Sequence, residues 1–459
     1  MSNTKDTLLG KIRNGESMNL REQAVLTLTL SIPAILAQVS TVMMSYIDTA
    51  MVGRLGANAS ASIGLISTST WLVGGLSMAA CSGFSVQIAH LMGSREYSSA
   101  RNVFRKGLIS VLVFSLLLAA ASIAVSGPLP RWLGGGEDIC ADASAYLMIY
   151  AAFLPLMQVG WLSGSALQAS GNMKVPSVLN IMMCVLDVLF NYVFIFVCGM
   201  GVRGAALGTG CAEAVTALAM LGFLARKSPE LRLDQERGRF LPDRECLRTA
   251  FGISGPMWIQ NIVMKGAYMA STVIVAPLGN IAIAANSFAI TAESFCYMPG
   301  YGVSEATTSL VGQSLGAGRK PLAKRFTWIS IGMGAFMMTV CAVAMFFGAE
   351  SIMAMLSTDP DVVALGAKCL RLEAFAETLY GVSIVAYGAC VGAGDTLVPS
   401  AMNLVSMWII RIGLALFLTP TMGLMGYWIA MCIELNVRGA LFLYRVRGDR
   451  WMKFKLKTS

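Results

Sequence analysis

The chain carries at residues 31–64 the stretch SIPAILAQVSTVMMSYIDTAMVGRLGANASASIG, and residues 254–287 repeat its pattern as SGPMWIQNIVMKGAYMASTVIVAPLGNIAIAANS. Both copies are apolar almost throughout. The match returns at Gly171 and Gly394, each of which is followed four residues later by Val-Pro-Ser. Such a duplication in an apolar chain is typical of secondary transporters, whose two similar halves rock about a site between them.

Composition identifies lipid as the main solvent of the chain. Hydrophobic residues make up 56% and charged residues 13% of the 459 residues, against roughly 25% charged in a soluble domain. The apolar runs reach the roughly 20 residues that a helix needs to cross a bilayer. We expect an all-α integral membrane protein with twelve transmembrane helices in two six-helix parallel repeats. The spans lie near residues 24–52, 61–90, 107–127, 143–166, 175–198, 204–225, 249–276, 283–310, 327–349, 368–391, 398–419 and 423–444.

The repeat also divides the chain into lobes. We expect an N-terminal six-helix lobe at 1–225, a cytoplasmic linker at 226–248 and a C-terminal six-helix lobe at 249–459. The linker is too short to hold a catalytic domain.

The formal charge of +9 is placed in a way that indicates membrane topology and argues against nucleic acid as a partner. Lys and Arg cluster in the loops after spans 2, 6, 8 and 12. By the positive-inside rule these loops and both termini are cytoplasmic. We expect a multi-pass protein of the plasma (inner) membrane.

The chain lacks the side-chain sets that enzymes and energy-coupling domains use. Eleven cysteines form no CxxC pair and fall mostly within apolar spans, as small buried hydrophobes do. No GxxxxGK[ST] phosphate loop is present, which excludes direct drive by ATP through that motif. With His90 as the single histidine, no cluster of nucleophile and base or of metal ligands stands out. We therefore expect a transporter without a cofactor.

The two copies differ at polar residues that mark a candidate coupling site. Carboxylates inside a bilayer are costly, so each is a functional candidate unless it is paired. Asp48 lies near the predicted outer end of the first span, where the second copy has Ser271. Asp187 and Asn191 lie four residues apart on one face of the fifth span, and Thr209 lies in the first turns of the sixth. We expect these four to converge as an oxygen cluster that holds H⁺ or a desolvated Na⁺.

Structural roles are the alternatives for these residues. Asp48 could anchor the end of its helix near the headgroups, and Thr209 could bond its own backbone. A structural ion pair is the weaker alternative for Asp187, because its half offers no basic residue in mid-span.

Buried charges of both signs mark the C-terminal half. The mixture favours internal ion pairs, with Lys265 opposite Glu293 and Arg411 opposite Glu377. A site for substrate or for a second ion is the alternative reading of the same residues.

Residues Ile32–Gly56, IPAILAQVSTVMMSYIDTAMVGRLG, resemble the first helix of the multidrug and toxic compound extrusion (MATE) family. Residues Val311–Gly316, VGQSLG, look like the family's VGQxLG turn. Gly204-Ala205-Ala206 with Thr209 and the paired Gly-Asn and Gly-Asp turns extend the resemblance over nearly the whole chain. The resemblance implies two six-helix bundles that form a V-shaped cavity and alternate access by rocking. It implies export of organic cations or amphipathic drugs against inward H⁺ or Na⁺. We expect the protein to function as a monomer.

By the same resemblance, Asp48 matches the family's helix-1 carboxylate, and Asp187, Asn191 and Thr209 match its supporting polar groups. The chain departs from the pattern twice. Many members have Asn before Asp in helix 5, whereas here Asp187 precedes Asn191. Some Na⁺-coupled members carry a Glu in helix 7, where this chain has Met264, so H⁺ is the favoured coupling ion.

A flippase for lipid-linked saccharides, a distant relative with similar helices, is the alternative function. It would need a strongly cationic central cavity for pyrophosphate, and mid-span Lys and Arg are few in this chain.

Overall fold

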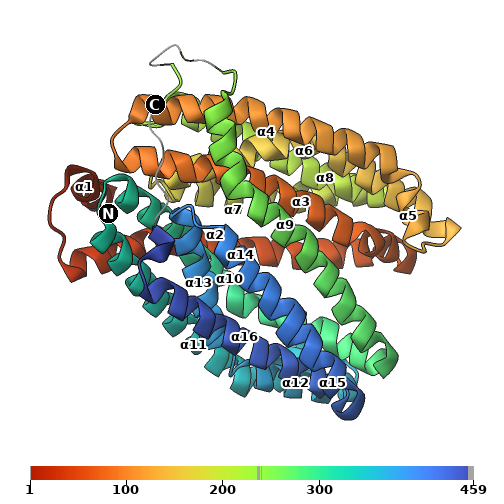
Figure 1. Ribbon diagram of the computed structural model, residues 1–459. Coiled ribbons are helices and arrows are strands. Elements are labelled where there is room, and N and C mark those ends of the chain that lie inside the picture. Colours follow the sequence, from red (N-terminus) through yellow and green to blue (C-terminus); the bar gives the residue numbers. More distant parts are fainter. Residues whose placement is uncertain (1, 235–237, 239, 453–459) are drawn as a thin grey trace. The chain divides into compact units, whose positions relative to one another are not determined.

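Every regular element in the described part of the chain is helical (Figure 1). The computed structural model describes residues 2–234, 238 and 240–452. In chain order the α-helices are α1 (Ser2–Asn14), α2 (Leu20–Gly53), α3 (Ala57–Gly93), α4 (Tyr97–Ser126), α5 (Leu129–Trp132), α6 (Glu137–Ala169), α7 (Lys174–Tyr192), α8 (Gly201–Lys227), α9 (Arg244–Val275), α10 (Asn280–Gly316), α11 (Lys320–Leu356), α12 (Pro360–Glu373), α13 (Glu377–Gly392), α14 (Leu397–Val405), α15 (Gly413–Met422) and α16 (Leu424–Arg447). Two π-helical segments, η1 (Val193–Val197) and η3 (Ser406–Ile412), and two 3-10 turns, η2 (Ala276–Leu278) and η4 (Arg450–Met452), complete the set.

Most of these helices can cross a membrane. Within the described residues ten are long and apolar enough, or eleven if the bent pair α12 and α13 counts as one span. The last predicted span falls on α16, which is 24 residues long but carries Glu434 and Arg438 on a buried face. Each predicted span therefore coincides with a helix or with a broken pair of helices.

The chain forms two compact units. One comprises Ser40–Trp258, and the other comprises Met1–Val39 together with Ile259–Ser459. Both divisions fall inside a helix, α2 and α9, in which the two copies of the repeated stretch begin. The predicted lobes, 1–225 and 249–459 with the linker 226–248, were derived from the sequence repeat. The two units are defined by packing contacts, so the predicted lobes stay a prediction.

In the unit Ser40–Trp258, α6 packs against α3, α4 and α8, and α7 packs against α8 (Figure 1). Small residues let these helices approach closely. A Cβ atom on Gly160 of α6 would lie 2.8 Å from Cβ of Ala217 on α8. This close packing fixes the rotation of α8, which places Thr209 and its neighbours against α7.

In the other unit, α10 packs against α11 and α13, and α13 packs against α16. The short helix α1 was not predicted from the sequence. It buries Leu8, Leu9 and Ile12, and Arg319 Nη1 donates to the carbonyl of Lys11 over 2.9 Å. An amphipathic helix of one charged and one apolar face is thus held against the end of α10.

Candidate functional site

A bridged pair of carboxylates lies at the contact of α2 and α7, within the unit Ser40–Trp258. Asn191 Nδ2 donates to Asp48 Oδ1 over 3.0 Å and to Asp187 Oδ2 over 3.1 Å. The two carboxyl groups also lie within hydrogen-bonding reach of each other. Three of the four residues predicted for the coupling cluster therefore meet directly, although Asp48 is far from the other two in sequence.

The geometry of α7 and α8 explains why these side chains meet. Asp187 and Asn191 are one helical turn apart and so share a face. On α8, Gly208 faces Asn191 of α7, and Gly204 faces η1, where a Cβ atom on Gly204 would lie 2.8 Å from the backbone of Phe194. The α-helix turns into the π-helical segment η1 two residues after Asn191, and such segments are frequent at functional sites.

Thr209 lies on α8 within hydrogen-bonding reach of the Asp187 carboxyl group, so the fourth predicted residue joins the cluster. Asp187 and Asn191 are 0% and 1% exposed, whereas Asp48 and Thr209 are half-buried. Asp187 Oδ1 and Asn191 Oδ1 have no hydrogen-bond partner among the described residues. The cluster therefore contains buried oxygen acceptors without a hydrogen-bond partner among the described residues, and such atoms can bind a proton or a cation.

Glu213 is a neighbour of the cluster that the sequence analysis missed. It follows Thr209 by one turn of α8, is half-buried and interacts electrostatically with Asp187. Its spacing from Thr209 on an apolar helix was the signal that could have identified it.

Three glutamates form a second acidic cluster, in the unit that contains α10 to α16. Glu293 of α10, Glu373 of α12 and Glu377 of α13 each place an oxygen within 4.8 Å of the others. Glu373 and Glu377 are 0% exposed, and none of their four carboxyl oxygens has a hydrogen-bond partner in the described part of the chain. The 59° bend between α12 and α13 turns these two side chains toward the same place.

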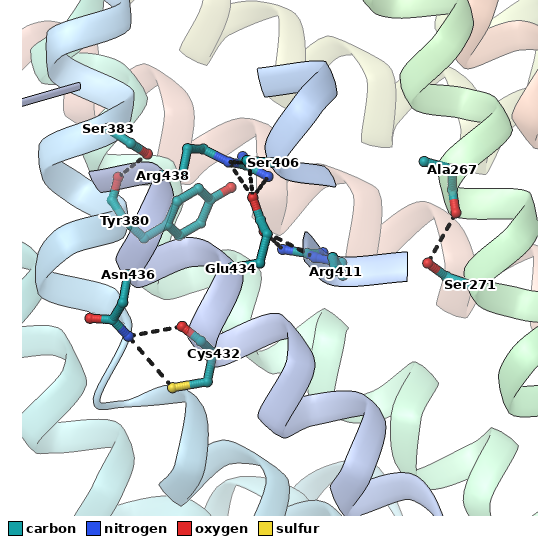
Figure 2. A network of polar contacts seen from close by, with 10 residues as sticks. All are labelled: Ala267, Ser271, Tyr380, Ser383, Ser406, Arg411, Cys432, Glu434, Asn436 and Arg438. Atoms are coloured by element: carbon teal, nitrogen blue, oxygen red, sulfur yellow. Dashed lines mark hydrogen bonds and ion pairs between the residues drawn. The ribbon is translucent and has the colours of Figure 1, made fainter. Parts of the chain in front are cut away.

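The predicted pairing of Arg411 with Glu377 is wrong. Arg411 Nη2 pairs instead with Glu434 Oε2 over 2.7 Å, and Arg438 Nη2 pairs with Glu434 Oε1 over 2.6 Å. Ser406 also donates to Glu434, which lies between these partners in Figure 2. Glu434 is 0% exposed and was missed by the sequence analysis, since its role depends on how α16 faces η3.

Lys265 and Glu293, which were predicted to pair, each lie beside other side chains. The Lys265 ammonium lies 5.6 Å from the centre of the Tyr268 ring, a cation–π distance. Glu293 lies with Glu373 and Glu377. The carboxylates discussed here therefore divide into an ion-paired one, Glu434, and an acidic group around Glu293.

Both clusters have the same chemical capacity. Their free donor atoms are carboxylate, amide and hydroxyl oxygens, which suit a proton or a hard cation rather than a soft metal. Adjacent carboxylates repel each other when both are ionised, so a cation between them is stabilising.

Comparison with known proteins identifies the family and the fold. The sequence model of the MatE family matches residues 33–193 and 256–417, which are the two halves of the repeat. A probable multidrug resistance protein NorM of Chromobacterium violaceum is 25% identical over 427 residues, covering 90% of this chain and 91% of that protein. A probable NorM of Thermotoga maritima is 25% identical over 445 residues, covering 94% and 93%. The crystal structure of the Vibrio cholerae MATE transporter VcmN in the bent form superposes with a TM-score of 0.86 at 17% identity, covering 93% of this chain and 97% of that one.

Proposed function

We propose that this chain, which belongs to the MatE family of multi-pass membrane transporters, exports amphipathic or cationic small molecules in exchange for inward H⁺ or Na⁺. The names of the NorM relatives support drugs as the substrate class. The carboxylate cluster supports coupling to a cation. The basic loops support cytoplasmic termini and a place in the plasma membrane. We also propose that the protein works as a monomer.

One observation carries the proposal for coupling: Asn191 bridges Asp48 and Asp187 through a single amide nitrogen. The bridge holds two carboxylates from two helices close together, and Asp187 Oδ1 remains without a partner in the described part of the chain. A proton shared by the two carboxyl groups, or a Na⁺ held by their oxygens with Thr209, would relieve their repulsion.

The proposed cycle follows from this arrangement. In the outward-facing state the cluster takes up an external cation, and the change in contact between α2 and α7 lowers the affinity for the drug. In the inward-facing state the cation leaves to the cytoplasm. Drug and cation need not compete for one place, since any difference in affinity between the two states couples them. One cation crossing about 100 mV supplies ~2.3 kcal/mol, enough for a gradient of a neutral substrate of roughly fifty-fold. A 1:1 exchange for a monocationic drug moves no net charge, so there the concentration gradient of H⁺ or Na⁺ supplies the drive.

Dye efflux from proteoliposomes tests the proposal. Vesicles loaded with a cationic fluorescent dye are given either a pH gradient or a Na⁺ gradient. We expect wild type to export the dye under at least one gradient and Asp48→Asn to export none under either. Asp138→Asn, a change of an exposed aspartate in the first turn of α6, is the matched control and should match wild type. Efflux by Asp48→Asn at the wild-type rate would reject the coupling role.

The glutamates Glu293, Glu373 and Glu377 are a second candidate cation site of the same function. The observation that favours them is that two of the three are fully buried without a hydrogen-bond partner among the described residues. Glu377→Gln should then change the number of cations exchanged per dye molecule, measured from the efflux at graded membrane potentials. An unchanged stoichiometry would assign these residues a structural role.

The flippase for lipid-linked saccharides remains the alternative function. Arg411 and Arg438 both pair with the single carboxylate of Glu434, which leaves a net charge of only +1 there and argues against a strongly cationic pyrophosphate site. Failure of dye efflux in wild type together with ion-independent movement of a pyrophosphate-linked lipid would favour this alternative.

A further inference from the structure

An apolar groove lies between α3, α4 and the start of α9, within the unit Ser40–Trp258. Its volume is about 290 Å³. Ala80 and Phe84 of α3, Phe114 and Leu117 of α4, and Phe251 and Trp258 of α9 line it. None of these residues belongs to the carboxylate cluster or to the three-glutamate cluster, so the groove has no role in the proposed coupling.

The polar groups on the wall of the groove are already bonded to backbone carbonyls. These bonds are Ser110 Oγ to Lys106 O (2.8 Å), Ser254 Oγ to Ala79 O (2.7 Å) and Trp258 Nε1 to Leu76 O (2.8 Å). Pockets for drug-sized ligands keep a few polar groups to orient the ligand and enclose roughly 300–1,000 Å³. This groove is at the lower limit of that range and has only apolar surface to offer, which suits a hydrocarbon chain.

Stacked aromatic rings form one wall of the groove, and exposed apolar side chains lie at its open side. Trp258 stacks on Phe114 with ring centres 5.3 Å apart and meets the edge of Phe251 at 5.4 Å. Leu117 and Phe251 are 66% and 56% exposed. On helices that cross a membrane, such exposed apolar side chains lie against the acyl chains of lipids. A lipid tail can therefore reach the groove from the side.

A basic end distinguishes this groove from an ordinary lipid-facing surface. Arg244, Leu247 and Phe251 follow the same face of α9 at helical spacing, and Arg248 lies beside them. Both arginines are exposed, and no ion pair of the described residues involves either one. Two acids belong to this segment: Asp243 is already paired with Lys106, and Glu245 of the first turn forms no ion pair with either arginine in the described part of the chain. The first turns of α9 thus present two positive charges at the end of the groove that we predict to be cytoplasmic.

We propose that the groove binds an anionic phospholipid of the surrounding membrane. One acyl chain lies against Phe251 and Trp258, and the phosphate lies at Arg244 and Arg248. The occupant is a lipid rather than a drug because the apolar wall and the basic end match the two parts of a phospholipid. Anionic lipids are also concentrated in the cytoplasmic leaflet, where the basic end is expected.

The repeat supplies an internal comparison. Phe251 and Trp258 correspond to Leu28 and Ile35 in the first copy, and Arg248 corresponds to Val25. The ring wall and one of the two arginines are therefore peculiar to the second copy. The lipid site is accordingly expected at the start of α9 and not at the start of α2.

Quenching of tryptophan by brominated lipid tests the site. The protein is reconstituted with phosphatidylglycerol or phosphatidylcholine that carries dibrominated acyl chains. In wild type we expect brominated phosphatidylglycerol to quench the tryptophan fluorescence at a lower mole fraction than brominated phosphatidylcholine does. This component of the quenching should vanish in Trp258→Phe, which keeps a ring in the groove. Arg244→Gln with Arg248→Gln should lower the affinity for phosphatidylglycerol by roughly fivefold for each arginine. Ser110→Phe, which fills the groove, should remove the component for both lipids.

The matched control is Arg226→Gln with Lys227→Gln, which removes the same charge from the exposed last turn of α8. It should leave the quenching of Trp258 unchanged. Equal quenching by the two lipids in wild type would overturn the proposal. Equal losses of affinity for phosphatidylglycerol in the two double variants would overturn it as well. Displacement of the brominated lipid by the cationic dye, with no effect of the arginine substitutions, would instead identify the groove as a drug site and overturn it.

Discussion

Gly208 of α8 allows an approach to Asn191 that no other residue would permit. A Cβ atom at this position would overlap Asn191 Oδ1 and would lie 2.8 Å from its backbone nitrogen. We expect Gly208→Ala to push the Asn191 amide away from Asp48 and Asp187. Ion-driven dye efflux from proteoliposomes should then fall by about tenfold or more, the loss typical of displaced groups that orient cation ligands.

Gly222 on the same helix is the control for this substitution, because a Cβ atom there would meet nothing within 4 Å. Gly222→Ala should keep wild-type efflux and stabilise the helix by roughly 0.5–1 kcal/mol. If both alanine variants pumped equally well, the close contact of Gly208 with Asn191 would not matter for coupling.

Single residues of the candidate site differed in how far the sequence could predict them. Asp48, Asp187 and Asn191 were predictable because the second copy of the repeat lacks a polar group of the same kind at each place, which singles them out. Arg411 was placed in the right half but given the wrong partner, since a pairing depends on helix rotation and on the π-helical segment η3. Glu434 falls on Cys211 in the first copy, so the comparison shows that the copies differ there, but its two arginine partners became visible only from packing.

At the scale of elements, Asp243 joins the start of α9 to α4. Its Oδ1 accepts from the backbone N–H of Cys246 over 3.0 Å, as in an N-cap, and its Oδ2 pairs with Lys106. Asp243→Ala should therefore destabilise the protein by about 1 kcal/mol. The measurement is thermal unfolding in detergent, with Asp234→Ala as a control, because Arg232 in the same loop is the one ion-pair partner of Asp234 among the described residues.

The same contact has a defined dependence on pH. The hydrogen bond from Lys106 holds the pKa of Asp243 below its ordinary value, which is about 3.9 in an unfolded chain. A lowered pKa means that the stabilisation is complete above the ordinary value and is lost as the pH falls through the lowered one. The difference in melting temperature between wild type and Asp243→Ala should be constant near neutral pH and shrink below about pH 4. A difference that grows on acidification would contradict this assignment.

Glu434 ties α16 to the π-helical segment η3 through two arginines. Removal of one partner from a buried ion pair leaves the other charge uncompensated and costs about 3–5 kcal/mol. We expect Glu434→Gln, which keeps the size of the side chain, to lower the melting temperature strongly. Glu350→Gln breaks an exposed pair with Arg371 and should cost about 0–1 kcal/mol. Similar melting temperatures for the two variants would show that the network around Glu434 does not stabilise the unit.

At the scale of the whole molecule, the membership of the chain in the MatE family and its all-helical membrane fold could be predicted from the sequence and are confirmed. Long apolar runs specify spans with little ambiguity, because a backbone in lipid must satisfy its own hydrogen bonds. The bend between α12 and α13 could not be predicted in this way, since its 374–376 break contains no proline or glycine. That bend positions Glu373 and Glu377, so the second acidic cluster depends on tertiary packing.

The orientation of the spans in the membrane is a prediction that one native cysteine can test. Cys198, between α7 and α8, is the exposed one among the eleven cysteines, and the positive-inside rule places its loop outside the cell. A membrane-impermeant maleimide should label wild type in intact cells and leave Cys198→Ser unlabelled. Cys198→Ser with Arg226→Cys carries its thiol at the exposed, basic end of α8 and should react only after the membrane is opened. The reverse pattern would invert the topology, and with it the direction in which the carboxylate cluster takes up its cation.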